Sequence, residues 1–409
     1  MKTSFRATAV RAVVLLASFA GSLHGQEWPQ WLGPGRDGRI AGFTPPATWP
    51  AALARAWEVP AGPADASPVL ADGRLFVVGR EGNGEVTLCL DPANGETIWR
   101  DHYETEGATG PASRHPGPRS TPSVAHGKVV TFGVRGTLSC LDAASGKVLW
   151  RKNDFPGAWP RFFTSASPVI VNDLCVALVG GGGQGGIAAY ELAGGDRRWL
   201  WSGDEPAYAS PVLATVAGTE QIVALTATKV VGVRVTDGAL LWEVPFAPRG
   251  RAYNAATPVV DGATVFVSGS GRGTKALRIE AVAAGFTARE LWANNDAAVQ
   301  FNTPLLKGGR LYGLSERGNF FCLDAATGAL VWTDPKGGLG GYGCILDGGG
   351  VLLATTPNSE LIVLSPGEAA YRELARIKVA DQPVYGCPVV VGKRILVQDQ
   401  NSVTAWQIE

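Results

Sequence analysis

The chain has 409 residues, with 36 Lys and Arg against 36 Asp and Glu, so its formal net charge is zero. This balance argues against a dedicated nucleic-acid binder, because phosphate contacts need surplus basic charge. Hydrophobic residues make up 45% of the chain, which excludes intrinsic disorder. The 54 glycines are nearly twice the usual share of about 7%, and together with 13 tryptophans they predict short strands, tight turns and repeated aromatic anchors.

Residues 1–25 have the pattern of a secretory signal peptide. Three basic residues come first, an apolar run extends from Ala12 to Ala20, and small residues offer cleavage points after Ala20 or after Gly25. The apolar run is far shorter than the ~20 residues that span a bilayer. We therefore predict an exported protein, periplasmic or secreted, without a transmembrane segment.

Residues 26–52 form a lead-in segment, and an internal repeat follows it. The phrase LDPANGETIW at residues 90–99 recurs as LDAASGKVLW at 141–150 and as LDAATGALVW at 323–332. Weaker copies end at Trp199 and Trp242. Self-similarity at a fixed period predicts a repeat architecture.

A second phrase, a hydroxyl residue followed by proline, opens most units of the repeat. It occurs at Ser67, Thr121, Ser167, Ser210, Thr257 and Thr303, and cysteine takes the hydroxyl position at Cys344 and Cys387. The spacing between successive positions is 41 to 54 residues, which gives eight units of about 43 residues.

Each unit contains four short β-rich runs separated by turn signals. In the Asp-x-x-(Thr/Ser/Asn)-Gly phrase, the Asp side chain caps its own turn and the Gly supplies a positive φ, so the phrase predicts a hairpin. Four antiparallel strands per unit predict an all-β protein, a β-propeller with eight four-stranded blades. Seven blades are the alternative, because the unit that opens at Cys344 is the most degraded copy.

The unit that opens at Cys387 ends after three strands and lacks its own tryptophan-ending strand. The segment LARAWEV around Trp57, upstream of the first unit, supplies the missing strand. We therefore expect the N- and C-terminal strands to pair in one blade, which removes an unpaired edge. Residues 53–409 are then a single propeller domain.

The Asp-x-x-(Thr/Ser/Asn)-Gly…Trp phrase resembles the tryptophan-docking repeat of pyrroloquinoline-quinone-type β-propellers. The segment EWPQWLGPGRDG at residues 27–38 resembles the lead-in of exported proteins of that superfamily. The resemblance implies a structural role between blades for the repeat tryptophans, which are Trp57, Trp99, Trp150, Trp199, Trp242, Trp292 and Trp332. It does not imply one function, because the superfamily includes quinoprotein alcohol dehydrogenases and an outer-membrane assembly factor that binds partners.

The six cysteines do not have the spacing of a metal site, since no Cys-x-x-Cys occurs, and we predict no metal. Cys89, Cys140 and Cys322 occupy the same position in different units and are expected to be small buried residues. Cys344 and Cys387 open the first strands of adjacent blades, where a disulfide is one option in an exported protein. The adjacent cysteines that quinoprotein dehydrogenases use beside their cofactor are absent.

The loops that enter the first strand of each blade converge on one mouth of the central channel, and they are rich in aromatic residues and arginine. That composition is typical of interface hot spots and also suits a glycan or a flat anion. We expect ligand or partner contacts from Arg119, Trp159, Arg161, Tyr208, Arg251, Tyr253, Asn254, Phe301, Asn302, Tyr342 and Tyr385. Three interpretations remain open: a plug of the channel, a partner surface and a small-ligand site.

The missing catalytic signatures favour a non-enzymatic scaffold that binds an envelope protein or a glycan, with no cofactor, as a monomer. The alternative is an alcohol or sugar dehydrogenase with pyrroloquinoline quinone and Ca²⁺ above the channel. Such a site would draw acids from Asp65, Glu205, Asp296 and Asp381, amides from Asn254, Asn294, Asn295 and Asn302, and cations from Arg119, Arg161 and Arg251. The loop from Asp101 to Arg119 is the longest and is the candidate lid.

Overall fold

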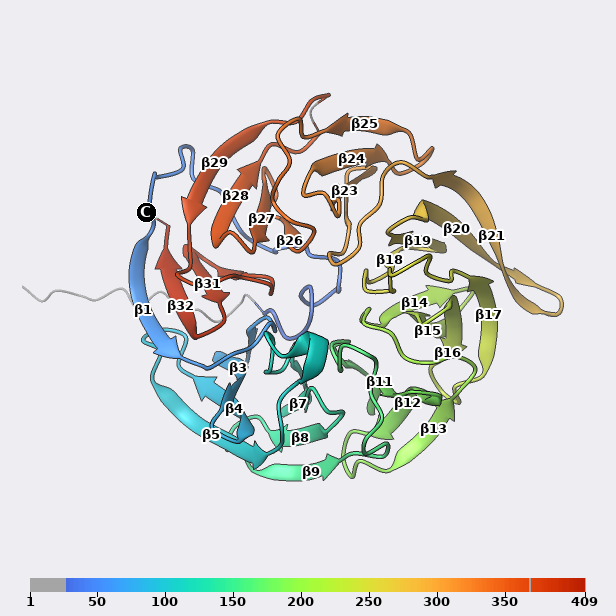
Figure 1. Ribbon diagram of the computed structural model, residues 1–409, viewed down its shortest axis with the longest axis horizontal. Coiled ribbons are helices and arrows are strands. Elements are labelled where there is room, and N and C mark those ends of the chain that lie inside the picture. Colours follow the sequence, from blue (N-terminus) through green and yellow to red (C-terminus); the bar gives the residue numbers. More distant parts are fainter. Residues whose placement is uncertain (1–26, 368, 409) are drawn as a thin grey trace, which may run out of the picture.

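The computed structural model describes residues 27–367 and 369–408, and these residues form 32 strands and one short 3-10 helix. The strands make eight antiparallel sheets of four strands each, arranged around a central axis (Figure 1). The predicted eight-bladed propeller is therefore confirmed, and the seven-bladed alternative is wrong. The predicted signal peptide lies outside the described residues. Within those residues, no helix has the length and apolar character needed to cross a membrane.

Each of the first four blades is a meander of consecutive strands, ordered from the axis outward. Blade 1 has β2 (Val69–Ala71), β3 (Arg74–Glu81), β4 (Gly84–Leu90) and β5 (Thr97–Glu104). Blade 2 has β6 (Ser123–Ala125), β7 (Lys128–Phe132), β8 (Leu138–Asp142) and β9 (Val148–Lys152), and the 3-10 helix η1 (Gly110–Ala112) precedes it. Blade 3 has β10 (Val169–Val171), β11 (Leu174–Gly181), β12 (Gln184–Glu191) and β13 (Arg197–Trp201). Blade 4 has β14 (Val212–Val216), β15 (Thr219–Leu225), β16 (Lys229–Arg234) and β17 (Leu240–Pro245).

The remaining blades follow the same order, except that the last one takes its outer strand from the other end of the chain. Blade 5 has β18 (Val259–Asp261), β19 (Thr264–Gly269), β20 (Gly273–Val282) and β21 (Gly285–Asn294). Blade 6 has β22 (Leu305–Lys307), β23 (Arg310–Leu314), β24 (Phe320–Asp324) and β25 (Leu330–Thr333). Blade 7 has β26 (Cys344–Asp347), β27 (Leu352–Thr356), β28 (Glu360–Leu364) and β29 (Glu373–Lys378). Blade 8 has β30 (Val389–Val391), β31 (Arg394–Gln398), β32 (Ser402–Gln407) and β1 (Ala54–Pro60).

The repeat phrase builds the contact between neighbouring blades, as the pair of Trp99 and Gly146 illustrates. Gly146 closes the Asp142 turn with a φ of +73°, and a Cβ added to it would lie 2.6 Å from the ring of Trp99 in the preceding blade. The indole N–H of Trp99 donates to the Ala143 carbonyl in the same turn at 3.1 Å. One phrase thus supplies both the ring and the flat surface on which the ring of the preceding blade lies.

Five of the seven predicted repeat tryptophans donate in this way to a carbonyl of the next blade. These bonds are Trp57 to Pro92, Trp99 to Ala143, Trp150 to Leu192, Trp199 to Val235 and Trp292 to Ala325. Trp242 instead donates to Gln221 of its own blade at 2.7 Å. Trp332 has no hydrogen-bond partner for its buried N–H among the described residues, and the next blade presents Tyr371 to its ring.

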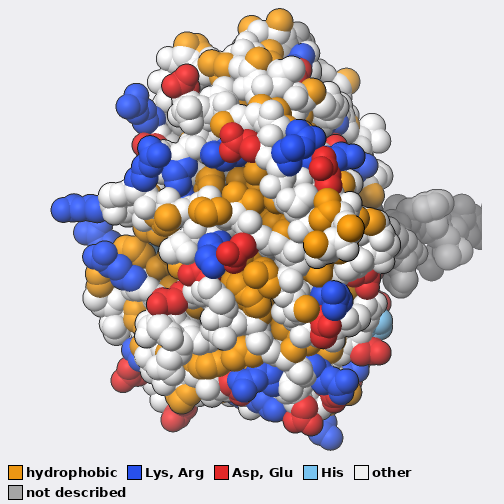
Figure 2. Space-filling model, turned by 90° about the vertical axis from the view of Figure 1, so that its right-hand side faces the viewer, with side chains coloured by type: hydrophobic (Ala, Val, Ile, Leu, Met, Phe, Trp, Pro, Cys, Tyr) orange, Lys and Arg blue, Asp and Glu red, His pale blue; other side chains and the backbone are white. Residues whose placement is uncertain are grey.

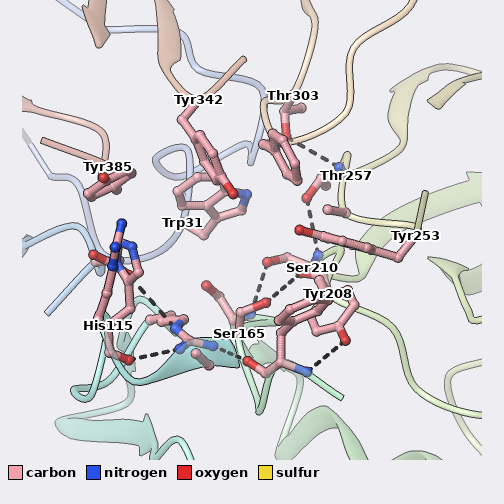
Figure 3. A pocket seen from close by; sticks show the side chains of 18 of the residues that line it. Trp31, His115, Ser165, Tyr208, Ser210, Tyr253, Thr257, Thr303, Tyr342 and Tyr385 are labelled. Atoms are coloured by element: carbon pink, nitrogen blue, oxygen red, sulfur yellow. Dashed lines mark hydrogen bonds and ion pairs between the residues drawn. The ribbon is translucent and has the colours of Figure 1, made fainter. Parts of the chain in front are cut away.

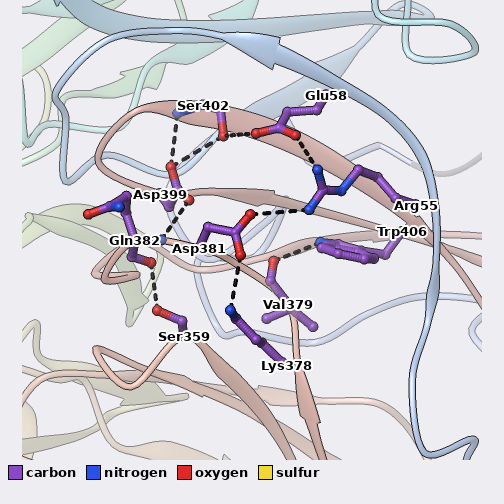
Figure 4. Close-up of polar contacts among 10 residues, drawn as sticks. All are labelled: Arg55, Glu58, Ser359, Lys378, Val379, Asp381, Gln382, Asp399, Ser402 and Trp406. Atoms are coloured by element: carbon purple, nitrogen blue, oxygen red, sulfur yellow. Dashed lines mark hydrogen bonds and ion pairs between the residues drawn. The ribbon is translucent and has the colours of Figure 1, made fainter.

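The ring of blades is closed as the sequence predicts, because β1 pairs antiparallel with β32 and places Trp57 opposite Ala405. Polar contacts reinforce this closure (Figure 4). Ser402 donates to Glu58 at 3.1 Å, while Arg55 forms ion pairs with Glu58 and with Asp381. These contacts join β1 to β32 within the closing blade and to Asp381, which follows the outer strand of blade 7.

The lead-in segment crosses the central channel before it reaches β1. Trp28 exchanges two backbone hydrogen bonds with Leu70 of blade 1, and Arg39 forms a parallel bridge with Asp347 of blade 7. Trp28 is 2% exposed and belongs to the largest apolar cluster, together with side chains of blades 1, 7 and 8. The lead-in is therefore packed against the propeller, where it reaches the region of the central axis (Figure 1) and pairs with blades 1 and 7.

The outer strands leave apolar side chains on the rim. The long hairpin of β20 and β21 extends away from the ring of blades (Figure 1), and Val282 and Leu291 on it are more than two-fifths exposed. Figure 2 shows this side of the molecule, where apolar side chains lie in patches between groups of both charges. The mixed charges match the neutral composition of the chain.

Candidate functional site

A cavity of about 350 Å³ opens at the channel mouth, where the loops that precede the inner strands converge (Figure 3). Six of the eleven side chains expected at the mouth line it, namely Arg119, Tyr208, Tyr253, Phe301, Tyr342 and Tyr385. They come from the entry loops of blades 2, 4, 5, 6, 7 and 8. The propeller therefore brings together residues that are up to 266 positions apart in the chain.

The aromatic residues form a continuous arc around the cavity. Phe301 and Tyr342 stack with their ring centroids 4.0 Å apart, and Tyr385 meets Tyr342 edge-on at 5.5 Å. On the other side, Tyr253 lies 5.6 Å from Phe301 and 4.9 Å from Tyr208. Burial raises the pKa of Tyr208, Tyr253, Tyr342 and Tyr385, so these phenols stay neutral hydrogen-bonding groups at physiological pH.

A polar cluster around Asp65 completes the wall. The Asp65 carboxylate lies 2.9 Å from Nδ1 of His115, 3.7 Å from Nε of Arg119, and accepts a hydrogen bond from Gln400. Arg119 is also held by the carbonyls of His115 and Phe162. Burial lowers the pKa of Arg119, and the nearby Asp65 charge opposes that effect. His115 meets Tyr385 edge-on at 4.9 Å, which joins this cluster to the aromatic arc.

The floor of the cavity includes Trp31, which comes from the lead-in segment (Figure 3). Its indole N–H is buried and has no hydrogen-bond partner among the described residues. Further along the lead-in, Arg36 is 7% exposed and donates to the carbonyls of Ser167 and Pro168. Burial lowers the pKa of Arg36 to about 9, so the group still carries its charge at neutral pH.

The hydroxyl residues that open the blades form a ring below the mouth. In each case the backbone N–H of one opening residue donates to the hydroxyl oxygen of the next: Ser67 to Thr121, Thr121 to Ser167, Ser167 to Ser210, Ser210 to Thr257 and Thr257 to Thr303, at 2.9 to 3.3 Å. The Cys387 N–H donates to Ser67 at 2.7 Å, and a Cys344–Cys387 disulfide joins blades 7 and 8. The disulfide left open by the sequence is therefore present.

The other four cysteines are free and buried, which agrees with the expectation for Cys89, Cys140 and Cys322. Burial raises the pKa of the Cys89 and Cys140 thiols to about 12. Thiols of this kind are poor nucleophiles because the reactive thiolate is rare at neutral pH.

Three of the residues expected at the mouth lie away from the cavity. Trp159 stacks on Phe163 with the ring centroids 5.3 Å apart, and the guanidinium of Arg135 lies over the Trp159 ring in a cation–π contact. Arg161 and Arg251 are exposed, and neither lines the cavity. All three lie in loops that enter a blade, but Trp159 packs within its loop, and Arg161 and Arg251 are exposed outside the cavity.

Two asparagines expected at the mouth instead support the loops from within. Asn254 is 2% exposed and donates to the carbonyls of Thr226 and Phe246. Asn302, also 2% exposed, donates to the Gly341 carbonyl and accepts from the Leu314 N–H. Both amides hold backbone groups that would otherwise be buried without partners.

The cavity residues do not fit a Ca²⁺-bound quinone. Calcium takes six to eight oxygen ligands, usually including several carboxylates. Asp65 is the one carboxylate among the lining residues, and it is already held by His115, Arg119 and Gln400. Asp381 is engaged with Arg55 and Lys378 near β1, and Asn294 donates to Gly328. The described residues contain no group of three His, Cys, Asp or Glu side chains suited to a metal ion.

The fold and the mouth define a class of protein, the eight-bladed propellers with repeats of the quinoprotein type. A family model described as outer membrane protein assembly factor BamB matches residues 36–199 and, in an overlapping alignment, 82–334. These matches cover most of the chain, and the chain belongs to this family of PQQ-like propellers.

Two curated relatives have different activities, one a dehydrogenase and the other an assembly factor. A quinohemoprotein alcohol dehydrogenase of Comamonas testosteroni is 28% identical over 140 residues, which are 34% of this chain and 19% of the enzyme. The BamB protein of Shewanella oneidensis is 22% identical over 277 residues, which are 65% of this chain and 56% of that protein. The chain thus aligns with about a fifth and about half of the lengths of these relatives.

Solved structures of both branches share the fold. BamB of Moraxella catarrhalis superposes with a TM-score of 0.64 at 13% identity, covering 87% of this chain and 100% of the other. The quinohemoprotein alcohol dehydrogenase of Comamonas testosteroni superposes with a TM-score of 0.69 at 13% identity, covering 93% of this chain and 80% of the enzyme. At this identity the likeness concerns the fold alone.

Proposed function

We propose that the protein is an exported, non-enzymatic scaffold whose channel mouth binds a protein or glycan of the cell envelope. The observation that carries this proposal is the aromatic arc from Tyr208 to Tyr385 around an open cavity with Arg119 at its side. Tyrosine, tryptophan and arginine are enriched among the few residues that dominate the binding free energy of recognition sites. The poor fit to Ca²⁺ leaves binding, rather than quinone chemistry, as the function that these residues support.

Location in the envelope is part of the proposal. The predicted signal peptide and the Cys344–Cys387 disulfide both suit an oxidising compartment. The match to the BamB family model and to the Shewanella protein adds support, because those proteins are described as outer-membrane assembly factors. We expect a mature monomer, which light scattering of the purified protein measures.

Site-specific cross-linking in intact cells tests the scaffold. A photo-reactive residue in place of Tyr342, which is 40% exposed at the mouth, is compared with one in place of Leu330, which is 52% exposed on the outer strand β25. We expect a defined adduct from position 342 that Phe301→Ala abolishes, and none from position 330. Equal labelling from both positions contradicts a mouth-specific partner.

The quinone alternative is tested separately. Pyrroloquinoline quinone is titrated into the purified protein while native tryptophan fluorescence is followed, with and without Ca²⁺. We expect no saturable quenching up to ~100 µM, because the lining offers a single, already engaged carboxylate. Saturable quenching that depends on Ca²⁺ would favour the dehydrogenase and overturn the scaffold.

A further inference from the structure

The floor of the mouth presents hydrogen-bond donors without acceptors. The Trp31 N–H is buried and has no partner among the described residues. Ser210 and Thr257 each use a hydroxyl oxygen to accept the N–H of the preceding blade, so each hydroxyl proton is left for another acceptor. Neither proton has an acceptor among the residues that the structure describes. A buried donor with no partner at all, such as the Trp31 N–H, is rare unless a ligand or water satisfies it.

The charge at the mouth points to the same type of ligand. Arg114 and Arg119 line the cavity, and Arg36 lies in the channel, joined to Ser167 in the floor. Arg36 forms no ion pair with any carboxylate among the described residues. Asp65 is the one carboxylate among the residues that line the cavity, and its oxygens are already occupied by side chains of the wall. The cavity therefore favours an anionic group that accepts several hydrogen bonds.

The walls favour a non-planar ring above that group. Neighbouring aromatic rings around the cavity meet at 41° to 89°, apart from the stacked pair of Phe301 and Tyr342. They surround the space from several directions and leave no flat slot between two parallel rings. Four of them are tyrosines, whose hydroxyls can pair with hydroxyls of a ligand. A sugar ring combines apolar C–H faces with hydroxyls on its edge and fits such walls.

A second depression continues the site beyond the cavity. It has a volume of about 510 Å³ and shares Arg114, His115 and Tyr385 with the cavity, while Gln382 and Gln400 line its far side. The two spaces are adjacent because they share these three residues, two of which, His115 and Tyr385, meet edge-on at 4.9 Å. A ligand longer than one sugar unit can therefore extend from the mouth toward blade 8.

We propose that the mouth binds an acidic oligosaccharide, with one uronic-acid ring inside the aromatic arc and its carboxylate on the donors of the floor. This inference rests on the proposed scaffold function and names the chemistry of its partner. Trp31, Ser210 and Thr257 donate to the carboxylate, while Arg119 and Arg36 supply the positive field. Arg114 meets the next acidic unit at the edge of the second depression.

Calorimetric titration of the mature protein tests the proposal with three matched sugars: trigalacturonic acid, its methyl ester and the neutral galactose trimer. We expect the acid to bind at least tenfold more tightly than the ester or the neutral trimer, and its affinity to fall with added salt. Trp31→Phe removes the floor N–H and should weaken acid binding about tenfold. Trp332→Phe is the matched control, because it also removes an unpartnered indole N–H but lies far from the cavity.

A second variant, at an exposed residue, keeps the proposal testable if Trp31→Phe fails to fold. Arg114 is exposed and forms no ion pair among the described residues, so Arg114→Gln should leave the fold intact and weaken acid binding severalfold. Equal affinity for acid and ester, or no affinity for any of the sugars, would overturn the inference. If the sugars fail to bind in this way but the photo-reactive residue at position 342 still gives a defined cross-link in cells, the proposed scaffold function stands and its partner is another molecule. If position 342 gives no defined cross-link either, both the sugar proposal and the scaffold proposal fail.

Discussion

Two sets of aromatic residues in this protein differ in place, one at the blade junctions and one at the channel mouth, and most of them differ in how their polar atoms are used. At the blade junctions, the indole N–H groups of Trp99, Trp150 and Trp199 each reach a carbonyl of the next blade. At the mouth, Trp31 has a buried N–H without such a partner among the described residues. A hydrogen bond to the next blade is the rule at the junctions, with Trp332 as an exception, and the unmatched donor of Trp31 is distinguished by its place in the floor of the cavity.

The largest predicted effect concerns the junction set. Trp99→Ala removes a ring that is 9% exposed and packed on Gly146, so the free energy of unfolding should fall by about 3–5 kcal/mol. Urea unfolding followed by circular dichroism measures the change. Trp99→Phe isolates the hydrogen bond to Ala143 and should cost more than Trp332→Phe by about 1 kcal/mol. Equal costs would mean that the N–H donation does not distinguish the junctions.

The second prediction concerns the junction between blades 7 and 8, where the Cys344–Cys387 disulfide takes the place of the opening hydroxyl residues of the other blades. The disulfide closes a loop with a sequence separation of 43 residues, so its loss in Cys344→Ser/Cys387→Ser should lower the unfolding free energy by about 2–4 kcal/mol. The serines restore the hydroxyls of the other units and keep the volume nearly unchanged. Unfolding with and without a reducing agent checks the effect: the wild type, but not the double variant, should respond to the reductant.

Most of the fold could be predicted from the sequence, because each blade repeats the same local turn and strand patterns. The turn phrase, the closing strand at Trp57 and the count of eight follow from local patterns. The six mouth residues followed from their place before each opening position. The position of Trp31 in the cavity could not be predicted, because the lead-in carries no repeat and its path depends on pairing with distant strands.

Other parts of the site were visible in the sequence but not interpretable. The opening hydroxyls were evident as a periodic feature, yet their partners are backbone N–H groups of the neighbouring blade, about 43–54 residues away. Asn254 and Asn302 occupy mouth loops, and only the structure reveals that their amides point inward to carbonyls. Side-chain direction in irregular loops is set by tertiary contacts, which composition does not encode.

A third prediction asks whether the mouth aromatics only plug the channel. Phe301 is stacked on Tyr342, which is 40% exposed, so Phe301→Ala should lower the unfolding free energy by only about 1 kcal/mol. Thermal unfolding beside Trp99→Ala makes the comparison direct. A cost as large as that of Trp99→Ala would assign the mouth ring to the structural set and remove the reason to expect a ligand there.

The smallest effect is a pH dependence at a buried carboxyl group that accepts two hydrogen bonds. Glu85 is 4% exposed, accepts from the Tyr103 hydroxyl and from the Val134 N–H of the next blade, and has its pKa raised chiefly by burial. A raised folded-state pKa means that the folded protein holds the proton more tightly than the unfolded chain. The stability from this group is therefore complete below about pH 4.5 and is lost as the pH rises through the folded-state pKa.

Glu85→Gln cannot titrate at this position, whereas every other carboxylate titrates equally in both proteins. The unfolding free energy of the wild type relative to Glu85→Gln should therefore decrease between pH 4 and pH 7, which urea titrations at several pH values measure. A difference that is constant over this range, or that grows with pH, would contradict the raised pKa. It would mean that the hydrogen bonds from Tyr103 and Val134 lower the pKa of Glu85 by more than burial raises it. A blade junction could then stabilise a charged carboxylate through hydrogen bonds, just as other junctions stabilise a neutral indole ring.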